Sequence, residues 1–327
     1  MNGKKLWSTF AYCVLGIMVA FTSAGADPWP SKPLTVISTF SAGGITDALS
    51  RIMAEELAKG LKQTVVVENR TGAGGAIALN YVAKAPAEGY LIVMGGASPS
   101  AIVPALNPAV GYHPSRDFQA MGLVADLPLV LVLHPSVPAK NLQEFITYVK
   151  ANPDKLNCAS HGEGSLLHLA CIQFDRMAGT KMVHVPYRGA AQVNPDLLAG
   201  RVQVYFGTLP TQLPFIKSGQ QRAIAIATRE RVASVPDIPT ISEAGLKGYE
   251  ISGWNALYVA AGTPKPIVDR LVAEVTRILA APEVQKKIEA TGSIMRPIVG
   301  DELQKFTAQE YEKYRKIATD ANIKLNF

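Results

Sequence analysis

The alternation of short β-rich runs, glycine-containing loops and helix-periodic segments is what most constrains this fold. β-rich runs lie at residues 34–39, 64–68 and 91–94. The first run is followed by a helical pattern in which apolar residues recur on one face as far as Gly60, and the second by a helical stretch that reaches Ala83. Three β-loop-α units in succession predict a parallel sheet with helices on its faces.

The same pattern restarts in the second half of the chain. Further strands are expected at residues 129–133, 156–159, 182–185, 202–206 and 223–227, and further helices at 141–151, 166–177, 266–280, 283–290 and 301–319. A chain of 327 residues is long enough for about two domains. No fixed-period repeat and no long linker is present, so the sequence predicts two α/β lobes with several crossovers.

The first 26 residues are typical of a secretory signal peptide. Lys4 and Lys5 precede an apolar run at residues 10–21, which is too short for a membrane span of about 20 residues. Small residues at 24–26 complete the pattern. We expect cleavage after Ala26 and a mature chain in the periplasm; the alternative is a buried N-terminal helix.

The cysteines are compatible with such an oxidising compartment. Cys13 would leave with the signal peptide, whereas Cys158 and Cys171 remain, 13 residues apart. Disulfides form in the periplasm, but spacing does not reveal whether two Cβ atoms face each other. A disulfide and two buried thiols both stay open.

The net charge of +6 argues only weakly for a nucleic-acid partner. Without Lys4 and Lys5 the basic residues fall from 32 to 30, against 26 acidic ones, so the net charge falls to +4. The remaining charges form no basic cluster interleaved with aromatic residues, as a nucleic-acid groove requires. A mildly positive field would instead help to attract anionic solutes.

Three loops combine a preceding strand, small residues and a following helix, at residues 38–47, 71–76 and 160–165. Ligands of open α/β sheets bind beyond the carboxyl ends of the strands, where helix N-termini favour anions. These loops therefore predict a site for a carboxylate or a phosphate. A dinucleotide cofactor is not expected, because Ile77 stands where the third glycine of the fingerprint belongs.

His161, Glu163, Ser165 and His168 cluster within eight residues and raise the question of a metal site or a hydrolase. Neither the H-E-x-x-H spacing nor a G-x-S-x-G elbow is present. We favour Ser165 as a helix cap and His168 as a loop or ligand contact; a hydrolase using both is the alternative. Arg188 could pair with an acid or lie solvated on the surface.

Many segments together resemble one family. The matching segments include Trp29-Pro30-Ser31-Lys32-Pro33-Leu34, Val65-Val66-Val67-Glu68-Asn69-Arg70, Gly72-Ala73-Gly74-Gly75, His134-Pro135-Ser136, His184-Val185-Pro186-Tyr187, Pro236-Asp237-Ile238-Pro239-Thr240 and Gly262-Thr263-Pro264. Over residues 28–325 the chain resembles the Bug receptors, the periplasmic solute-binding proteins of the tripartite tricarboxylate transporter family.

The resemblance implies a type II periplasmic binding protein, a Venus flytrap of two Rossmann-like lobes joined by two crossovers. One lobe would hold residues 27–127 and 250–327, and the other residues 128–249. It also implies a monomer without catalytic activity, cofactor or metal, which captures a small carboxylate for membrane transporter subunits. A sensor with the same fold, feeding a signalling partner, is an alternative.

The resemblance further implies that a first-lobe loop at residues 40–47 and a second-lobe loop at 160–168 hold the carboxylate. With the neighbouring loops, the expected ligand-binding residues are Phe40, Ser41, Ala42, Gly43, Gly44, Thr46, Asp47, Ala73, Gly74, Ala97, Ser98, Ser160, His161, Gly164, Ser165, His168, Tyr187, Arg188 and Gly207. Gly207 stands where the family commonly has an aspartate, and His161 stands where the family usually has a small residue. These departures predict a larger or differently charged pocket.

Overall fold

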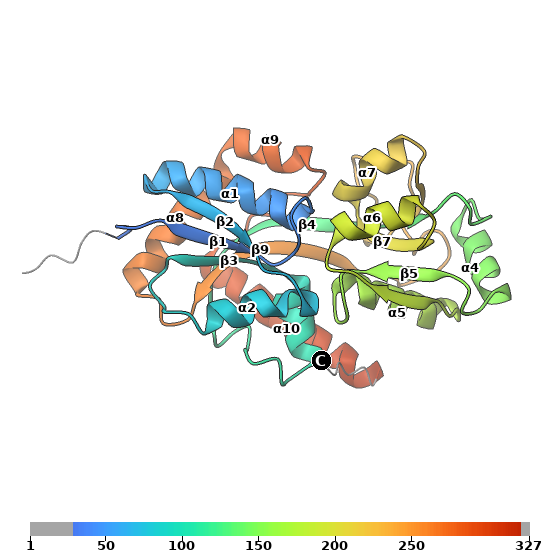
Figure 1. Cartoon of the computed structure of the whole chain (residues 1–327), viewed down its shortest axis with the longest axis horizontal. Coiled ribbons are helices and arrows are strands. Elements are labelled where there is room, and N and C mark those ends of the chain that lie inside the picture. Colours follow the sequence, from blue (N-terminus) through green and yellow to red (C-terminus); the bar gives the residue numbers. More distant parts are fainter. Residues whose placement is uncertain (1–28, 322–327) are drawn as a thin grey trace, which may run out of the picture.

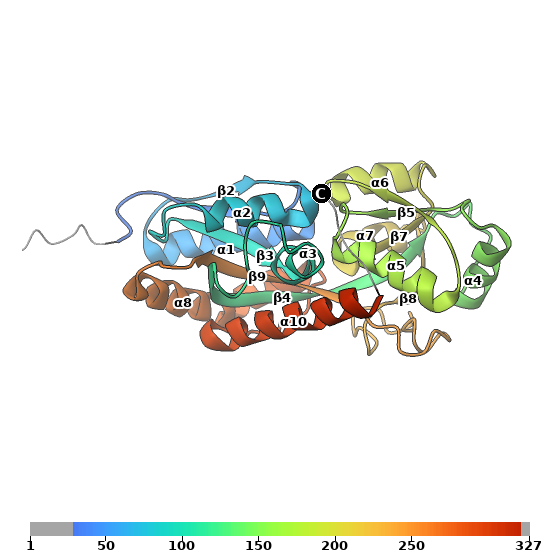
Figure 2. The ribbon, with the colours of Figure 1, turned by 90° about the horizontal axis from the view of Figure 1, so that it is seen from below.

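One long strand organises the fold. In the computed structural model, which describes residues 29–321, β4 (Phe118–Leu133) pairs with β9 (Ser252–Ala260) as far as Pro128. From Leu129 onward it pairs instead with β7 (Val204–Thr208). Figure 2 shows β4 running from one lobe into the other. We propose that the lobes divide where this pairing changes. The expected signal peptide and its cleavage site lie outside the described residues.

The sheet of the first lobe is parallel at one edge and antiparallel at the other. β1 (Leu34–Ser38) pairs in parallel with both β2 (Val65–Asn69) and β3 (Leu91–Gly96), as the three β-loop-α units predicted. β9 then pairs antiparallel with β3 and with β4, which gives the order β2-β1-β3-β9-β4. The sequence analysis missed β9 and the first part of β4, and so missed the mixed character of this sheet.

The second lobe repeats the arrangement around the far end of β4. β5 (Asn157–Ser160) pairs in parallel with β6 (Val183–Pro186) and with β7, while β8 (Arg222–Ile226) pairs antiparallel with β4. In both lobes, the loops that follow parallel strands lead into helices. Those loops lie at the junction of the two lobes, where Figure 1 shows α1 close to α6 and α7.

Helices cover both faces of each sheet (Figure 1). In the first lobe they are α1 (Ile45–Leu61), α2 (Ala76–Ala83), α3 (Val103–Leu106), α8 (Lys265–Ala280), α9 (Pro282–Ala290) and α10 (Gly300–Ala321), with the short turns η1 (Ala73–Gly75) and η2 (Ser98–Ile102). In the second lobe they are α4 (Leu142–Ala151), α5 (Leu166–Ala178), α6 (Ala190–Leu198) and α7 (Leu209–Lys217). No helix within residues 29–321 has the length and apolar character needed to cross a membrane.

The apolar stripe predicted for α1 is its buried face. Leu49, Met53 and Leu57 are fully buried and belong to the same apolar cluster as Leu34 and Val36 of β1. Burying one such side chain stabilises a fold by about 2 kcal/mol. This packing fixes α1 on the sheet and thereby sets the position of its N-terminus at the junction.

The Asp47 carboxylate holds the loop before α1 in place. The Asp47 carboxylate accepts a hydrogen bond from the Gly43 N–H at 3.1 Å, from Asn69 Nδ2 at 2.9 Å and two from Arg51 at 3.0 Å. Burial alone would raise the pKa of Asp47, but these hydrogen bonds together hold that pKa below its usual value of 3.8. Asn69 Nδ2 also donates to the Phe40 carbonyl oxygen at 2.9 Å, so the cluster fixes both ends of the loop.

A disulfide joins Cys158 of β5 to Cys171 of α5, with a Cα–Cα distance of 6.5 Å. It closes a loop across 13 residues that contains the segment between β5 and α5. The structure therefore resolves the alternative that the sequence left open. The crosslink ties α5 to the sheet immediately behind the junction of the lobes.

Reducing this disulfide should destabilise the protein. In the chain-entropy model a loop of this size contributes about 3 kcal/mol. We expect the free energy of unfolding of the oxidised protein, measured in urea, to be higher by about that amount than the values for the reduced protein and for a Cys158→Ala/Cys171→Ala variant. Equal midpoints in the oxidised and reduced states would contradict the assignment.

Replacing Asp47 should destabilise the protein in a pH-dependent way. A carboxyl group whose pKa is lower in the folded state stabilises the fold above its unfolded pKa and loses this effect as the pH falls through its folded pKa. We expect Asp47→Asn to lower the free energy of unfolding by about 2 kcal/mol at neutral pH. The difference should shrink in urea titrations performed below pH 3.8, the usual Asp value.

Asp269→Asn is the matched control for this measurement. Asp269 also pairs with a cation four positions away, but both Asp269 and Lys265 are exposed. Such surface pairs contribute less than about 1 kcal/mol. A loss of equal size in the two variants would show that the Asp47 cluster has no special role in the fold.

Candidate ligand-binding cleft

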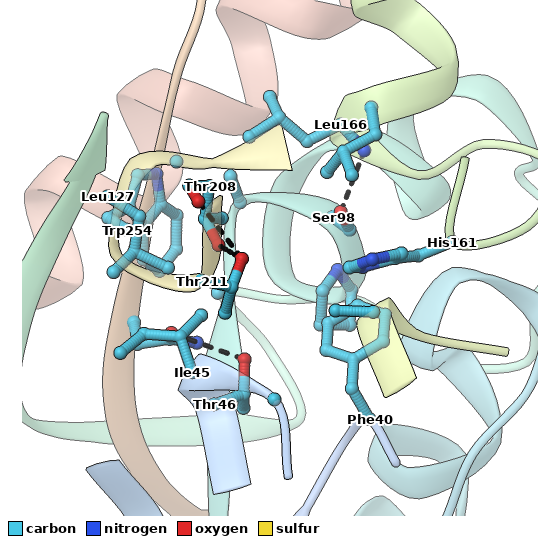
Figure 3. A pocket seen from close by; sticks show the side chains of 18 of the residues that line it. Phe40, Ile45, Thr46, Ser98, Leu127, His161, Leu166, Thr208, Thr211 and Trp254 are labelled. Atoms are coloured by element: carbon cyan, nitrogen blue, oxygen red, sulfur yellow. Dashed lines mark hydrogen bonds between the residues drawn. The ribbon is translucent and has the colours of Figure 1, made fainter. Parts of the chain in front are cut away.

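A small pocket lies where the two lobes meet, with a volume of about 50 Å³ (Figure 3). Both lobes contribute to its walls. The lining residues are Phe40, Ser41, Gly44, Ile45, Thr46, Gly96, Ala97, Ser98, Pro99, Leu127, His161, Leu166, Leu167, Ala190, Thr208, Thr211, Gly253, Trp254 and Asn255.

The N-termini of four helices converge on this pocket. α1 contributes its first residues from one lobe, and α5, α6 and α7 contribute theirs from the other. The first N–H groups of a helix have no partner within the helix, and they carry partial positive charge. Gly44, Gly189 and Thr208, the residues that precede α1, α6 and α7, make no side-chain capping hydrogen bond. Three helices therefore leave N–H donors available at the same cavity.

The pocket wall carries no formal charge. Among the described residues that line it there is no Asp, Glu, Lys or Arg. Besides the His161 and Trp254 rings, its polar side chains are hydroxyls and an amide: Thr208 Oγ1 lies 2.8 Å from Thr211 Oγ1, and Thr46 Oγ1 donates to Asn255 Oδ1 at 3.3 Å. In Figure 3 these groups lie among the apolar side chains of Leu127 and Trp254. An anion bound here would be held by backbone dipoles and hydroxyl groups rather than by a side-chain cation.

The two lobes touch around the pocket. The Leu166 N–H, at the start of α5, donates to Ser98 Oγ of the other lobe at 2.8 Å (Figure 3). A Cβ atom added at Gly189 would lie 2.2 Å from Ser41 Oγ, so these loops approach closely. The structure thus represents the lobes in a closed arrangement.

His161 forms one side of the pocket and is fixed from two directions. Its ring lies against Phe40 of the first lobe, with a centroid distance of 5.6 Å (Figure 3). Its Nε2 atom lies 2.5 Å from the Tyr205 hydroxyl oxygen. Burial lowers the pKa of His161 to about 4, so the imidazole is neutral at ordinary pH.

A second, open compartment of about 360 Å³, here called the outer compartment, also has His161 in its wall. It is lined by Gly72, Ala73, His161, Gly162, Pro186, Tyr187, Arg188 and Gln192. Tyr187 is held there by a hydrogen bond to Asp196 Oδ2 at 2.7 Å.

Ser165 and His168 hold the second-lobe loop and do not form a nucleophile–base pair. Ser165 is fully buried, and its Oγ accepts a hydrogen bond from the His168 N–H at 3.2 Å, which is the capping role that the sequence favoured. His168 Nδ1 accepts from the Gly164 N–H at 3.2 Å. The His168 ring stacks on His184 at 3.8 Å, and burial followed by the His184 charge lowers the pKa of His168 to about 4. His184 Nε2 in turn lies 2.6 Å from Ser160 Oγ.

The expected ligand-binding residues are placed in three groups. The residues that line the pocket are Phe40, Ser41, Gly44, Thr46, Ala97, Ser98 and His161. The residues that line the outer compartment are Ala73, Tyr187 and Arg188, again with His161. The residues that line neither are Ala42, Gly43, Asp47, Gly74, Ser160, Gly164, Ser165, His168 and Gly207.

Several residues of the third group support the site from behind. Asp47, Ser165 and His168 fix the two loops, as described above. A Cβ atom at Gly74 would lie 3.3 Å from the Glu163 carbonyl oxygen, so Gly74 lets the loops of the two lobes pack together. At Gly207 a Cβ atom would lie 2.5 Å from Gln212 Cγ and 2.6 Å from the Tyr205 ring. The space beside Gly207 is therefore filled by these two side chains, and Gly207 does not line the pocket; that its departure alters the size or charge of the pocket stays a prediction.

Other lining residues were missed because the elements that carry them were missed. Ala190, Thr208 and Thr211 belong to α6, α7 and their caps, and Gly253, Trp254 and Asn255 belong to β9. Pro195 and Pro214 inside the two helices hid their periodicity. The strand–glycine–helix pattern of Tyr205 to Leu209 was the available signal. No cluster of three or more His, Cys, Asp or Glu suitable for a metal ion occurs within the described part of the chain.

Comparison with known proteins agrees with this architecture. Residues 49–323 match the family described as "Tripartite tricarboxylate transporter family receptor". The chain is similar to the periplasmic binding protein BugD, with 33% identity and a TM-score of 0.84 over 90% of this chain and 99% of BugD.

Two proteins from Rhodopseudomonas palustris are similar to the same extent. Rpa4515, solved with adipate, is 32% identical with a TM-score of 0.85 over 90% of this chain and 99% of that chain. MatC, solved with bound malate, is 32% identical with a TM-score of 0.83 over 88% of this chain and 99% of that chain. The chain therefore belongs to the tripartite tricarboxylate transporter receptor family, as a two-lobed periplasmic solute-binding receptor.

Proposed function

We propose that this receptor captures a small carboxylated organic anion between its lobes and delivers it to membrane transporter subunits. The observation that carries the proposal is the convergence of four helix N-termini on a pocket without charged side chains. Such N-termini favour anions. The adipate and malate bound to the similar proteins Rpa4515 and MatC support a carboxylate as the ligand.

The geometry suggests how binding closes the lobes. The first turn of α1 offers N–H donors from one lobe, and the first turns of α6 and α7 offer them from the other. A carboxylate that accepts from both sides, directly or through a bridging water, binds the closed state more tightly than the open one. The closed population then rises with ligand concentration, as in other hinged receptors.

We also propose that the protein acts without catalysis, cofactor or metal, as a monomer in the periplasm. The hydrolase alternative needs an accessible Ser165 hydroxyl bonded to an imidazole, but Ser165 is fully buried and its Oγ bonds to the backbone N–H of His168 rather than to an imidazole ring. His168 Nδ1 is itself occupied by the Gly164 N–H. Delivery to a transporter is favoured over sensing because the matched family is one of transporter receptors.

Binding should require the negative charge of the ligand. We expect adipate or malate, used as probes, to raise the unfolding temperature in a saturable way, because at a concentration of 100 times Kd a ligand stabilises the folded state by about 2.7 kcal/mol. The corresponding diamides have similar shape without charge and should give no shift. Equal shifts with acids and amides would contradict anion capture, and so would the absence of any shift across a broad panel of organic acids.

Removing the hydroxyl of Ser98 should weaken binding without weakening either lobe. The variant Ser98→Ala deletes the acceptor of the Leu166 N–H, the hydrogen bond between the lobes, and should cost about 1 kcal/mol of closure, or about fivefold in Kd. Titration calorimetry with the best acid measures this loss, and small-angle scattering measures compaction.

Ser100→Ala is the matched control. Ser100 is also buried in η2, but its Oγ accepts from the Gly96 N–H of the same lobe at 3.3 Å. This variant should lower the free energy of unfolding while it leaves Kd unchanged. An unchanged Kd in Ser98→Ala would show that the hydrogen bond between Ser98 and Leu166 does not stabilise the closed state.

A further inference from the structure

His161 borders two spaces. Among the described residues it alone lines both the pocket of about 50 Å³ and the outer compartment of about 360 Å³. Its ring stands between Phe40, at 5.6 Å, and the Tyr205 hydroxyl, at 2.5 Å from Nε2. These two contacts come from different lobes, so the ring is held across the boundary when the lobes are closed.

Two features hold the His161 ring in place. Burial lowers the pKa of His161 to about 4, so the ring does not acquire a charge that would draw it toward solvent at neutral pH. Tyr205 is itself fully buried, which gives the hydrogen bond a fixed partner. A neutral aromatic ring, packed and hydrogen-bonded, acts here as a wall rather than as an anion-binding group.

The outer compartment is suited to a second anionic group. Arg188 lines it, and within residues 29–321 the Arg188 guanidinium has no ion-pair or hydrogen-bond partner. Only its backbone is engaged, where the N–H donates to Gln192 Oε1 at 3.0 Å. The wall also contains Ala73, a residue with a left-handed backbone at φ 48°, a strained conformation of the kind that clusters at functional sites.

We propose that His161 is the residue that limits ligand length. It ends the pocket on the side of the outer compartment and keeps the ligand away from Arg188. Removal of the ring would join the two spaces and would admit longer acids whose far end is anionic. This inference rests on the proposed function, because it assumes that an acid binds at the helix N-termini.

The test compares Kd along a series of α,ω-dicarboxylates, from malonate to suberate, for the wild type and for His161→Ala. We expect the affinity of the wild type to fall once the acid is longer than the pocket, because one methylene too many in a tight pocket costs about 10-fold or more. In His161→Ala the longest acids should gain about 10-fold over the wild type, whereas the shortest should not gain.

A second pair of variants separates the wall from its other properties. His161→Phe keeps an aromatic ring without the hydrogen bond to Tyr205 and should retain the length limit of the wild type. His161→Ala/Arg188→Gln should lose the gain for suberate but keep the affinity for octanoate, which has the same length and no second carboxylate. Circular dichroism and unfolding temperatures check that all variants fold.

The outcomes distinguish this inference from the proposed function. If the wild type binds suberate as tightly as its best short acid, or if His161→Ala leaves the length profile unchanged, His161 is not the length limit although the receptor still binds acids. If no acid binds any of the folded proteins, the proposed function fails and the inference fails with it.

Discussion

The whole architecture depends on the sharing of β4 between two sheets. Its first part completes the sheet of one lobe through β9, and its last five residues, Leu129 to Leu133, complete the other through β7 and β8. Because β4 is continuous, it keeps the two sheets next to each other and restricts how they can move relative to each other. The loops that follow the parallel strands of both lobes then open toward one junction, and the helices that follow begin there. The position of the site is therefore determined mainly by the topology of the sheets rather than by particular side chains.

This topology explains why the pocket needs no cation of its own. Each helix that begins at the junction contributes partial positive charge, and α1, α6 and α7, which have no side-chain cap, also contribute N–H donors. Asp47, the charged residue at the end of the first loop, is paired with Arg51 and does not line the pocket. Removing a carboxylate from water is costly, but fixed dipoles from both lobes can replace its hydration. The same dipoles link binding to closure, because neither lobe supplies all of them.

Much of the fold was predictable, and the failures have identifiable physical causes. The stripe of Leu49, Met53 and Leu57 predicted α1, and the three β-loop-α units predicted the parallel part of the first sheet. α6 and α7 were not predicted because proline interrupts the helical pattern of each. Ala190 and Thr211, the pocket residues that these helices carry, were therefore not predicted either. Asp47 was expected to touch the ligand. Its pair with Arg51, four residues along α1, is local, but its hydrogen bond from Asn69 depends on how two loops meet, which local sequence does not encode.

The central claim is that backbone N–H groups at converging helix N-termini hold the anion. A crystal structure of the protein with a bound dicarboxylate tests it most directly. The account predicts carboxylate oxygens about 3 Å from main-chain nitrogens in the first turns of α1 and of α6 or α7, or one bridging water away. A carboxylate paired instead with an arginine side chain, with those first turns unoccupied, would contradict it.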